Sequence, residues 1–318
     1  MRRFIGQLLR ASCGPRHTWG YRNSARGAFL SFEARFEDAK RRCANLVQSQ
    51  EEPVFIFSAG WRSGSTLLQR MLMRHNSNIL IWGEPFTRAD ILGTMMSQFR
   101  AFDQEWPKDS YFVSKRMQQK LSDQGVANLY PDVQNLFAAH LRFLEDLLMH
   151  PAREQGFSQW GVKEVTWGSE HALYLRYFYP KAKFLFLYRN PLDAYASFYR
   201  VCDGWFDRWP TSLIATPYAF GKAWARLTED FLLSSKALGA MLLRYEDLDN
   251  KEVIDGLAQY VGWTLPRASE LRRLATDKIE IKDVPDTQVP WIDRVFLTFA
   301  TRRVARLAGY SEKLSDPG

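Results

Sequence analysis

One short stretch constrains the fold of this chain more than any other. The segment PVFIFSAGWRSGSTLLQRML, residues 53–72, begins with apolar and aromatic residues and ends in an apolar pattern with helical spacing. Gly60 and Gly64 lie between the two halves. The pattern predicts a buried strand, a glycine-rich turn and a helix that packs on a sheet. Such a turn points free backbone N–H groups at one spot and favours a bound phosphate there.

The turn lacks the lysine of a triphosphate-binding loop. That loop has the pattern G-x-x-x-x-G-K-[ST], whereas here the glycines are one residue closer and Ser65 replaces the lysine. No predicted strand ends in an aspartate suited to Mg²⁺. Arg62 offers a planar, charged fork to a phosphate, and Ser63 and Thr66 offer hydroxyl donors. We therefore expect an anion less charged than Mg·ATP, or else an ordinary Gly/Ser turn.

Strand-like and helix-like segments alternate along the rest of the chain. Apolar runs predict further strands at 78–82, 160–165, 182–189 and 240–248. Helical spacing predicts helices at 32–50, about 169–179 and about 218–238, and a mainly helical insertion at about 87–158. This alternation predicts an α/β fold, in which a parallel sheet is flanked by helices on both faces. Ligands bind such sheets at the carboxyl ends of the strands.

Charge is unevenly distributed along the sequence. The net charge is +8, but residues 1–32 hold six arginines and no acid, which leaves about +2 for the remainder. A nearly neutral body argues against a nucleic-acid partner. The arginine-rich start has two interpretations: a basic extension of a cytoplasmic protein, which we favour, or an organelle-targeting segment.

Cysteine content argues against a disulfide-rich or metal-binding protein, and hydropathy argues against a membrane-spanning one. The three cysteines, Cys13, Cys43 and Cys202, are far apart, which predicts free thiols in a reducing compartment and no metal site. No stretch approaches the roughly 20 apolar residues that a transmembrane helix needs.

Three motifs together resemble the PAPS-dependent sulfotransferases. WRSGSTLL (61–68) resembles their 5′-phosphosulfate loop, YRNPLDAYASFYR (188–200) their 3′-phosphate segment, and RYEDL (244–248) a third motif. The matches follow the family's order and span roughly residues 53 to 265. The resemblance implies a sulfotransferase with the P-loop NTPase-like architecture and PAPS, 3′-phosphoadenosine 5′-phosphosulfate, as co-substrate. A sulfonate can be stabilised by arginine, lysine and oriented amides without a metal.

The resemblance assigns the cofactor-binding residues. It implies that the 5′-phosphosulfate is held by Arg62, Ser63, Gly64, Ser65 and Thr66. It implies that Arg189 and Ser197 bind the 3′-phosphate, although Ser197 lies about 10 Å along the expected helix. Tyr245 is expected either near the adenine or as a buried tyrosine at a strand end.

The same resemblance suggests the catalytic groups. Some family members use a histidine as base and others a glutamate just after the second strand, which here is Glu84 in GEPF. Its alternative is a capping or salt-bridging carboxylate. Lys163 matches the lysine placed near the leaving oxygen, and its alternative is pairing with a neighbouring acid. Glu164 should point to the opposite face of the strand. His171 is a weaker candidate base.

The acceptor is expected to be a hydroxyl compound: a glycan, lipid, small natural product or peptide tyrosine. The glutamate pattern is closer to tyrosylprotein and bacterial carbohydrate-type members. Tryptophans near the strand ends could stack on a sugar or phenol, or belong to the core. They are Trp82, Trp160, Trp167, Trp205 and Trp209. Rival functions are a P-loop nucleotide kinase and a non-catalytic nucleotide-binding relative.

The motifs divide the chain into three regions. Residues 1–50 form the basic N-terminal extension and its helix, and residues 51–265 form the α/β core with its insertion. Residues 266–318 are expected to close over the nucleotide as a lid or to shape the acceptor cleft.

Overall fold

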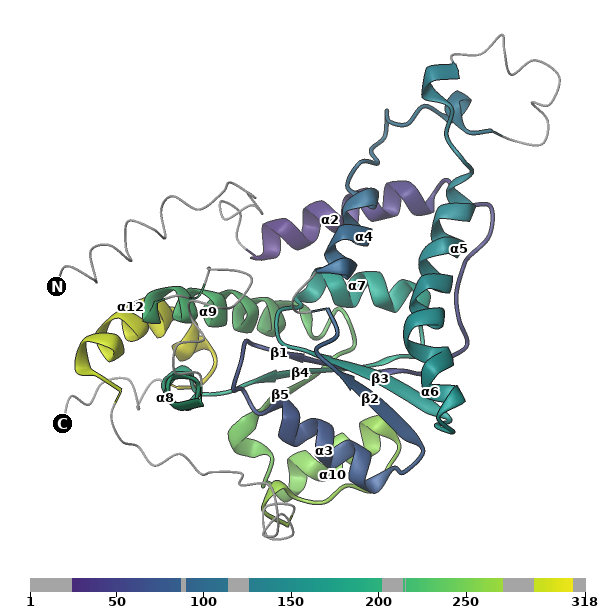
Figure 1. Cartoon of the computed structure of the whole chain (residues 1–318). Coiled ribbons are helices and arrows are strands. Elements are labelled where there is room, and N and C mark those ends of the chain that lie inside the picture. Colours follow the sequence, from purple (N-terminus) through teal and green to yellow (C-terminus); the bar gives the residue numbers. More distant parts are fainter. Residues whose placement is uncertain are drawn as a thin grey trace.

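A computed structural model describes residues 25–86, 90–113, 126–201, 214, 216–270 and 289–310 (Figure 1). Its centre is a parallel sheet with strand order β2-β3-β1-β4-β5. The strands are β1 (Val54–Ser58), β2 (Ile79–Gly83), β3 (Gln159–Glu164), β4 (Lys183–Tyr188) and β5 (Met241–Arg244). The predicted parallel sheet is therefore confirmed, with β1 paired on both sides.

Helices cover both faces of the sheet. Figure 1 shows α3 (Ser65–His75) and α10 (Lys251–Val261) on one face. The opposite face carries α2 (Ala25–Lys40), α4 (Ile91–Phe99), α5 (Val133–Leu144), α7 (Ser169–Phe178) and α9 (Pro217–Ser234). The remaining longer helices are α6 (His150–Glu154), α8 (Pro191–Val201) and α12 (Trp291–Leu307), and α12 packs on α9 and α8.

The alternation of side chains along β1 produces two separate cores. Val54 and Ile56 face α3 and α10 and lie in one buried apolar cluster. Phe55 and Phe57 point the other way, into a larger aromatic cluster under α2, α5 and α7. All five residues of β1 are buried, as expected for the central strand of a sheet covered on both faces. Burying each large apolar side chain contributes about 1.5–3 kcal/mol, so burial anchors β1 firmly between the two cores.

Two predicted boundaries are wrong. The helix predicted at 32–50 ends at Lys40, and Leu46, which its spacing placed on the buried side, is 70% exposed. The strand predicted at 240–248 ends at Arg244, because Tyr245–Asp247 form a short 3₁₀ turn. In both segments the apolar pattern of the sequence continues beyond the observed end of the element. The boundary therefore could not be read from the pattern alone.

The predicted insertion is only partly helical. It contains α4, α5 and α6, with 3₁₀ turns at Asp109–Tyr111 and Val126–Asn128 and a π-helical turn at Glu145–Met149. Figure 1 shows the described residues between α4 and α5, 100–113 and 126–132, extending away from the sheet.

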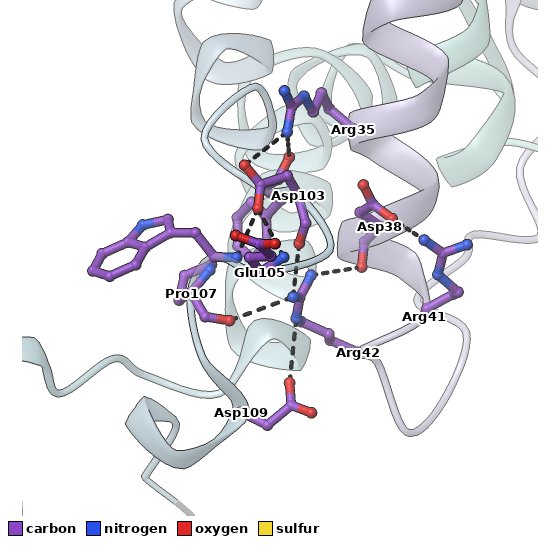
Figure 2. A network of polar contacts seen from close by, with 10 residues as sticks. Arg35, Asp38, Arg41, Arg42, Asp103, Glu105, Pro107 and Asp109 are labelled. Carbon is purple, nitrogen blue, oxygen red and sulfur yellow. Dashed lines mark hydrogen bonds and ion pairs between the residues drawn. The ribbon is translucent and has the colours of Figure 1, made fainter.

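Arg35 of α2 and Arg42, two residues after the end of α2, hold the base of this extension (Figure 2). Arg42 donates 2.8 Å to the carbonyl oxygen of Asp103, and Arg35 forms an ion pair with the same residue's carboxylate at 2.9 Å. Their other acceptors are the carbonyls of Asp38, Phe102 and Pro107 and the carboxylate of Asp109. Because the acceptors are mainly backbone carbonyls, the arginines fix the path of the chain at residues 102–109.

The C-terminal region is described only in part. Residues 271–288 and 311–318 lie outside the described residues, so the expected lid stays a prediction. Among the residues that the structure does describe, no helix has both the length and the apolar character needed to cross a bilayer.

Candidate active site

Hydrogen bonds to backbone carbonyl groups hold the turn between β1 and α3 in a tight conformation. The Gly60 N–H donates to the carbonyl oxygens of Ser58 (2.7 Å) and Val165 (3.2 Å). The Ser63 hydroxyl, fully buried, donates to the Ala59 carbonyl at 3.0 Å. The Ser63 side chain therefore shapes the turn, and what it can offer a ligand is its backbone N–H.

Gly64 is required at the start of α3 for two reasons. Its φ is +92°, a left-handed conformation that residues with a side chain rarely adopt. A Cβ on Gly64 would also lie 2.1 Å from the Tyr245 ring. The close approach of Tyr245 places the end of β5 directly against the turn.

The first turn of α3 is suited to binding an anion. It contains no acidic residue, and in the described part of the chain no side chain caps its N–H groups. Ser65 is buried there, whereas Thr66 is exposed. Uncapped N–H groups carry the positive end of the helix dipole, which attracts a phosphate or sulfate.

Two arginines meet beside this helix start. The Arg62 Nε donates to the Ser197 hydroxyl of α8 at 2.9 Å. The Arg189 guanidinium donates to the Arg62 carbonyl at 3.3 Å and lies over the Tyr245 ring, 4.2 Å from its centroid. The sequence assigned Arg62 and Ser197 to opposite ends of one nucleotide, and the structure brings them into direct contact.

Glu84 and Lys163 form an ion pair at the same edge of the sheet. Gly83 pairs with Lys163 in the parallel register, and the Glu84 N–H continues the ladder to the Lys163 carbonyl at 2.7 Å. The Lys163 ammonium contacts Glu84 Oε1. The Lys163 side chain is 6% exposed and that of Glu84 is 27% exposed. A solute can therefore reach the carboxylate more easily than the ammonium.

Backbone strain also marks this edge. Of the described non-glycine residues, Arg62, Glu84 and Asp90 have positive φ, at 63°, 52° and 22°. Such conformations cost about 1–3 kcal/mol each and occur mainly at functional sites. Two of the three are residues that the sequence had assigned to cofactor binding and catalysis.

Glu164 faces away from Lys163, as predicted. It is fully buried and accepts the Phe86 N–H at 2.8 Å. This bond fixes the turn that follows Glu84. Glu164 is therefore a second carboxylate that supports the site, a role that the sequence did not suggest.

The histidines do not meet at this edge. His171 stacks on Trp167, with ring centroids 5.6 Å apart. Burial lowers the pKa of His171 to about 3, with smaller contributions from Arg226 and Arg100, so it is a weak base. His140 is buried against Tyr174, and burial lowers its pKa to about 4. His75 ends α3 at the end opposite the turn, and His150 contacts Asp146. His17 lies outside the described residues.

The tryptophans belong mainly to the core. Trp160 and Trp167 are almost fully buried, which supports the core interpretation for both. Trp82 is half-buried and donates 3.0 Å to the Leu148 carbonyl. Trp205 and Trp209 lie outside the described residues.

Sequence reasoning missed the residues that hold Arg189 in place. Trp224 of α9 donates to the Arg189 carbonyl at 2.9 Å, and Glu246 accepts the Asn190 N–H at 2.9 Å. These contacts join segments 35 and 56 residues apart. Only the RYEDL motif gave any signal for Glu246, and nothing local marked Trp224.

Comparison with known proteins bears on what this edge of the sheet does. A family model described as "Sulfotransferase family" matches residues 53–266. No curated protein matches the chain.

Solved structures with a similar fold include three sulfotransferases. The sulfotransferase domain of the Synechococcus PCC 7002 olefin synthase is 18% identical to this chain, with a TM-score of 0.44. The alignment covers 83% of this chain and 98% of the olefin synthase domain. Sulfotransferase STF9 from Mycobacterium avium is 15% identical, with a TM-score of 0.40 and coverages of 89% and 83%. Mouse SULT7A1, complexed with PAP, is 11% identical, with a TM-score of 0.42 and coverages of 89% and 92%.

The buried His171 should make stability depend on pH. Its pKa is about 3 when folded, against roughly 6.5 when unfolded. The unfolded state therefore binds the proton first, so the stability from neutral His171 is complete above about pH 6.5 and declines as pH falls toward 3. In urea unfolding, the free energy of unfolding of His171→Gln should fall less steeply than that of the wild type as pH is lowered below 6.5. The exposed His75→Gln serves as control, and an unchanged slope for His171→Gln would contradict the assignment.

Proposed function

Because the chain belongs to the sulfotransferase family, we propose that it transfers a sulfuryl group from PAPS to an acceptor hydroxyl. One observation carries this proposal. Arg62, Arg189 and the uncapped start of α3 converge at the edge of the sheet that also holds the Lys163–Glu84 pair. The first group binds anions, and the pair supplies an acid and a base beside them.

The residues present fit the anionic ends of PAPS. The 5′-phosphosulfate suits the turn and the start of α3, where the backbone N–H groups of residues 62–66 and the Ser65 and Thr66 hydroxyls are available as donors. Gly64 leaves room for the Tyr245 ring to pack directly against this turn. The 3′-phosphate suits Arg189, with Ser197 beside it. Because Ser197 accepts a hydrogen bond from Arg62, one contact links the residues assigned to the two ends.

Tyr245 has a supporting role in this arrangement. Its ring touches Gly64 on one side and lies under the Arg189 guanidinium on the other. A cation over an aromatic face is attracted to the ring. Tyr245 therefore sets the spacing between the turn and Arg189, whether or not the adenine also rests against it.

In the transfer, Glu84 of the Lys163–Glu84 pair serves as the base and Lys163 as the stabilising cation. When bound, PAPS would supply the sulfuryl group. Glu84, the more exposed partner, accepts the proton of the acceptor hydroxyl. Lys163 is buried beside Glu84, and its ammonium group neutralises the negative charge that develops on the leaving side. This assignment places the chain with the glutamate-base members of the family, and the acceptor is a hydroxyl-bearing glycan, lipid, natural product or tyrosine.

Nucleotide binding tests the cofactor assignment. In calorimetry without Mg²⁺, the protein should bind adenosine 3′,5′-bisphosphate much more tightly than ADP. Arg62→Ala and Arg189→Ala should each weaken that binding by about 1.5–3 kcal/mol, the usual scale for hydrogen bonds to charged groups. Arg74→Ala, exposed at the far end of α3, is the control. A preference for ADP that requires Mg²⁺ would indicate a kinase and refute the proposal.

Turnover tests the base. Glu84→Gln should leave binding of adenosine 3′,5′-bisphosphate nearly intact and reduce sulfuryl transfer by about 10²–10⁴-fold, as expected when a general base is lost. The assay uses labelled PAPS with an acceptor found by screening hydroxyl compounds. Glu252→Gln, exposed on α10, should keep wild-type turnover. If Glu84→Gln turns over at the wild-type rate, Glu84 has no part in the mechanism.

A further inference from the structure

The C-terminal helix lies outside the family match but reaches the nucleotide-binding segment. The matched residues end at 266, whereas α12 begins at Trp291. Figure 1 shows α12 alongside α9 and close to α8, and it packs on both. Its position raises the question of what it contributes to α8, the helix that follows Arg189.

Tyr310, just after α12, packs against the ends of β4 and β5. It is 5% exposed, its ring lies 6.1 Å from that of Tyr188, and the Arg244 guanidinium lies 4.8 Å above it. Its hydroxyl donates to Glu246 Oε2 at 2.8 Å. Burial, and then the Glu246 carboxylate, raises the pKa of Tyr310, so the hydroxyl remains a donor at neutral pH.

The other oxygen of Glu246 holds the peptide group after Arg189. Glu246 Oε1 accepts the Asn190 N–H at 2.9 Å, and Trp224 Nε1 donates 2.9 Å to the Arg189 carbonyl. These two groups belong to one peptide plane, which is therefore held from both sides. Tyr310 contacts both holders, since its ring also lies 6.5 Å from that of Trp224.

A second contact holds α8 itself, one turn beyond the peptide plane between Arg189 and Asn190. Asp293 in the first turn of α12 accepts the Tyr195 hydroxyl of α8 at 3.0 Å. Tyr195 is two residues before Ser197. The two ends of α12 thus hold α8 near Arg189 and near Ser197, the two residues assigned to the 3′-phosphate.

We propose that α12 and Tyr310 are a positioning element for the 3′-phosphate site. Through Glu246 and Trp224, Tyr310 sets the orientation of the peptide plane between Arg189 and Asn190. That orientation directs the Arg189 side chain before a nucleotide arrives. Its consequence for binding rests on the proposed function, since it assumes that Arg189 binds the 3′-phosphate.

The test compares two nucleotides that differ only in the 3′-phosphate. The ratio of Kd values for AMP and adenosine 3′,5′-bisphosphate reports what that phosphate contributes. Tyr310→Phe and Glu246→Ala should lower this ratio by about three- to tenfold, the scale of one ordinary hydrogen bond. Kd for AMP should stay at the wild-type value. Glu246→Gln removes the charge but keeps an acceptor oxygen, so it should retain most of the ratio.

Tyr260→Phe is the matched control. Its hydroxyl donates 2.9 Å to the Gly239 carbonyl and accepts the Phe184 N–H near the start of β4, at the end opposite Arg189, so its loss should leave the ratio unchanged. A ratio that stays at the wild-type value in Tyr310→Phe and Glu246→Ala would overturn the positioning role. So would an equal loss of affinity for both nucleotides accompanied by a lower Tm. A wild-type protein that binds both nucleotides equally would instead refute the proposed cofactor, and with it the positioning role.

Discussion

The parallel hydrogen bonding of β1 between β3 and β4 is the constraint on which the rest of the structure depends. It brings the carboxyl ends of five strands to one edge of the sheet. The turn with Arg62 follows β1, Glu84 follows β2, and Lys163 is the next-to-last residue of β3. Arg189 and Tyr245 follow β4 and β5 directly. Residues spread over more than 180 positions therefore share one small region, and they do so because β1 is buried on both faces and cannot shift its register.

Much of this arrangement could be predicted because its signals are local. A buried strand, two glycines and an apolar helix pattern define the turn, and the rule for parallel sheets places Glu84 and Lys163 at the same edge. The contact between them is one of the alternatives that the sequence left open for both residues. It is compatible with the proposed catalysis, because an ion pair keeps the proposed base and the cation side by side. The strain at Arg62 and Glu84 could not be predicted, since no turn motif requires positive φ at either residue.

The remainder depends on long-range contacts that carry no local pattern. Ser197 contacts Arg62 across 135 residues, and Tyr310 reaches Glu246 across 64. The early end of α2 has a similar cause, because Arg42 binds carbonyls of the distant insertion. In each case a polar side chain forms a hydrogen bond with a group that is distant in sequence and near only in the folded chain. The pattern of apolar residues along the sequence carries no information about such a contact.

We propose above all that Arg62 and Arg189 hold opposite ends of one doubly phosphorylated adenosine. A crystal structure of the protein with adenosine 3′,5′-bisphosphate tests it most directly. The claim predicts the 5′-phosphate on the backbone N–H groups at the start of α3 and the 3′-phosphate within hydrogen-bonding distance of Arg189. A nucleotide bound elsewhere, or bound in this place with its 3′-phosphate away from Arg189, would contradict it.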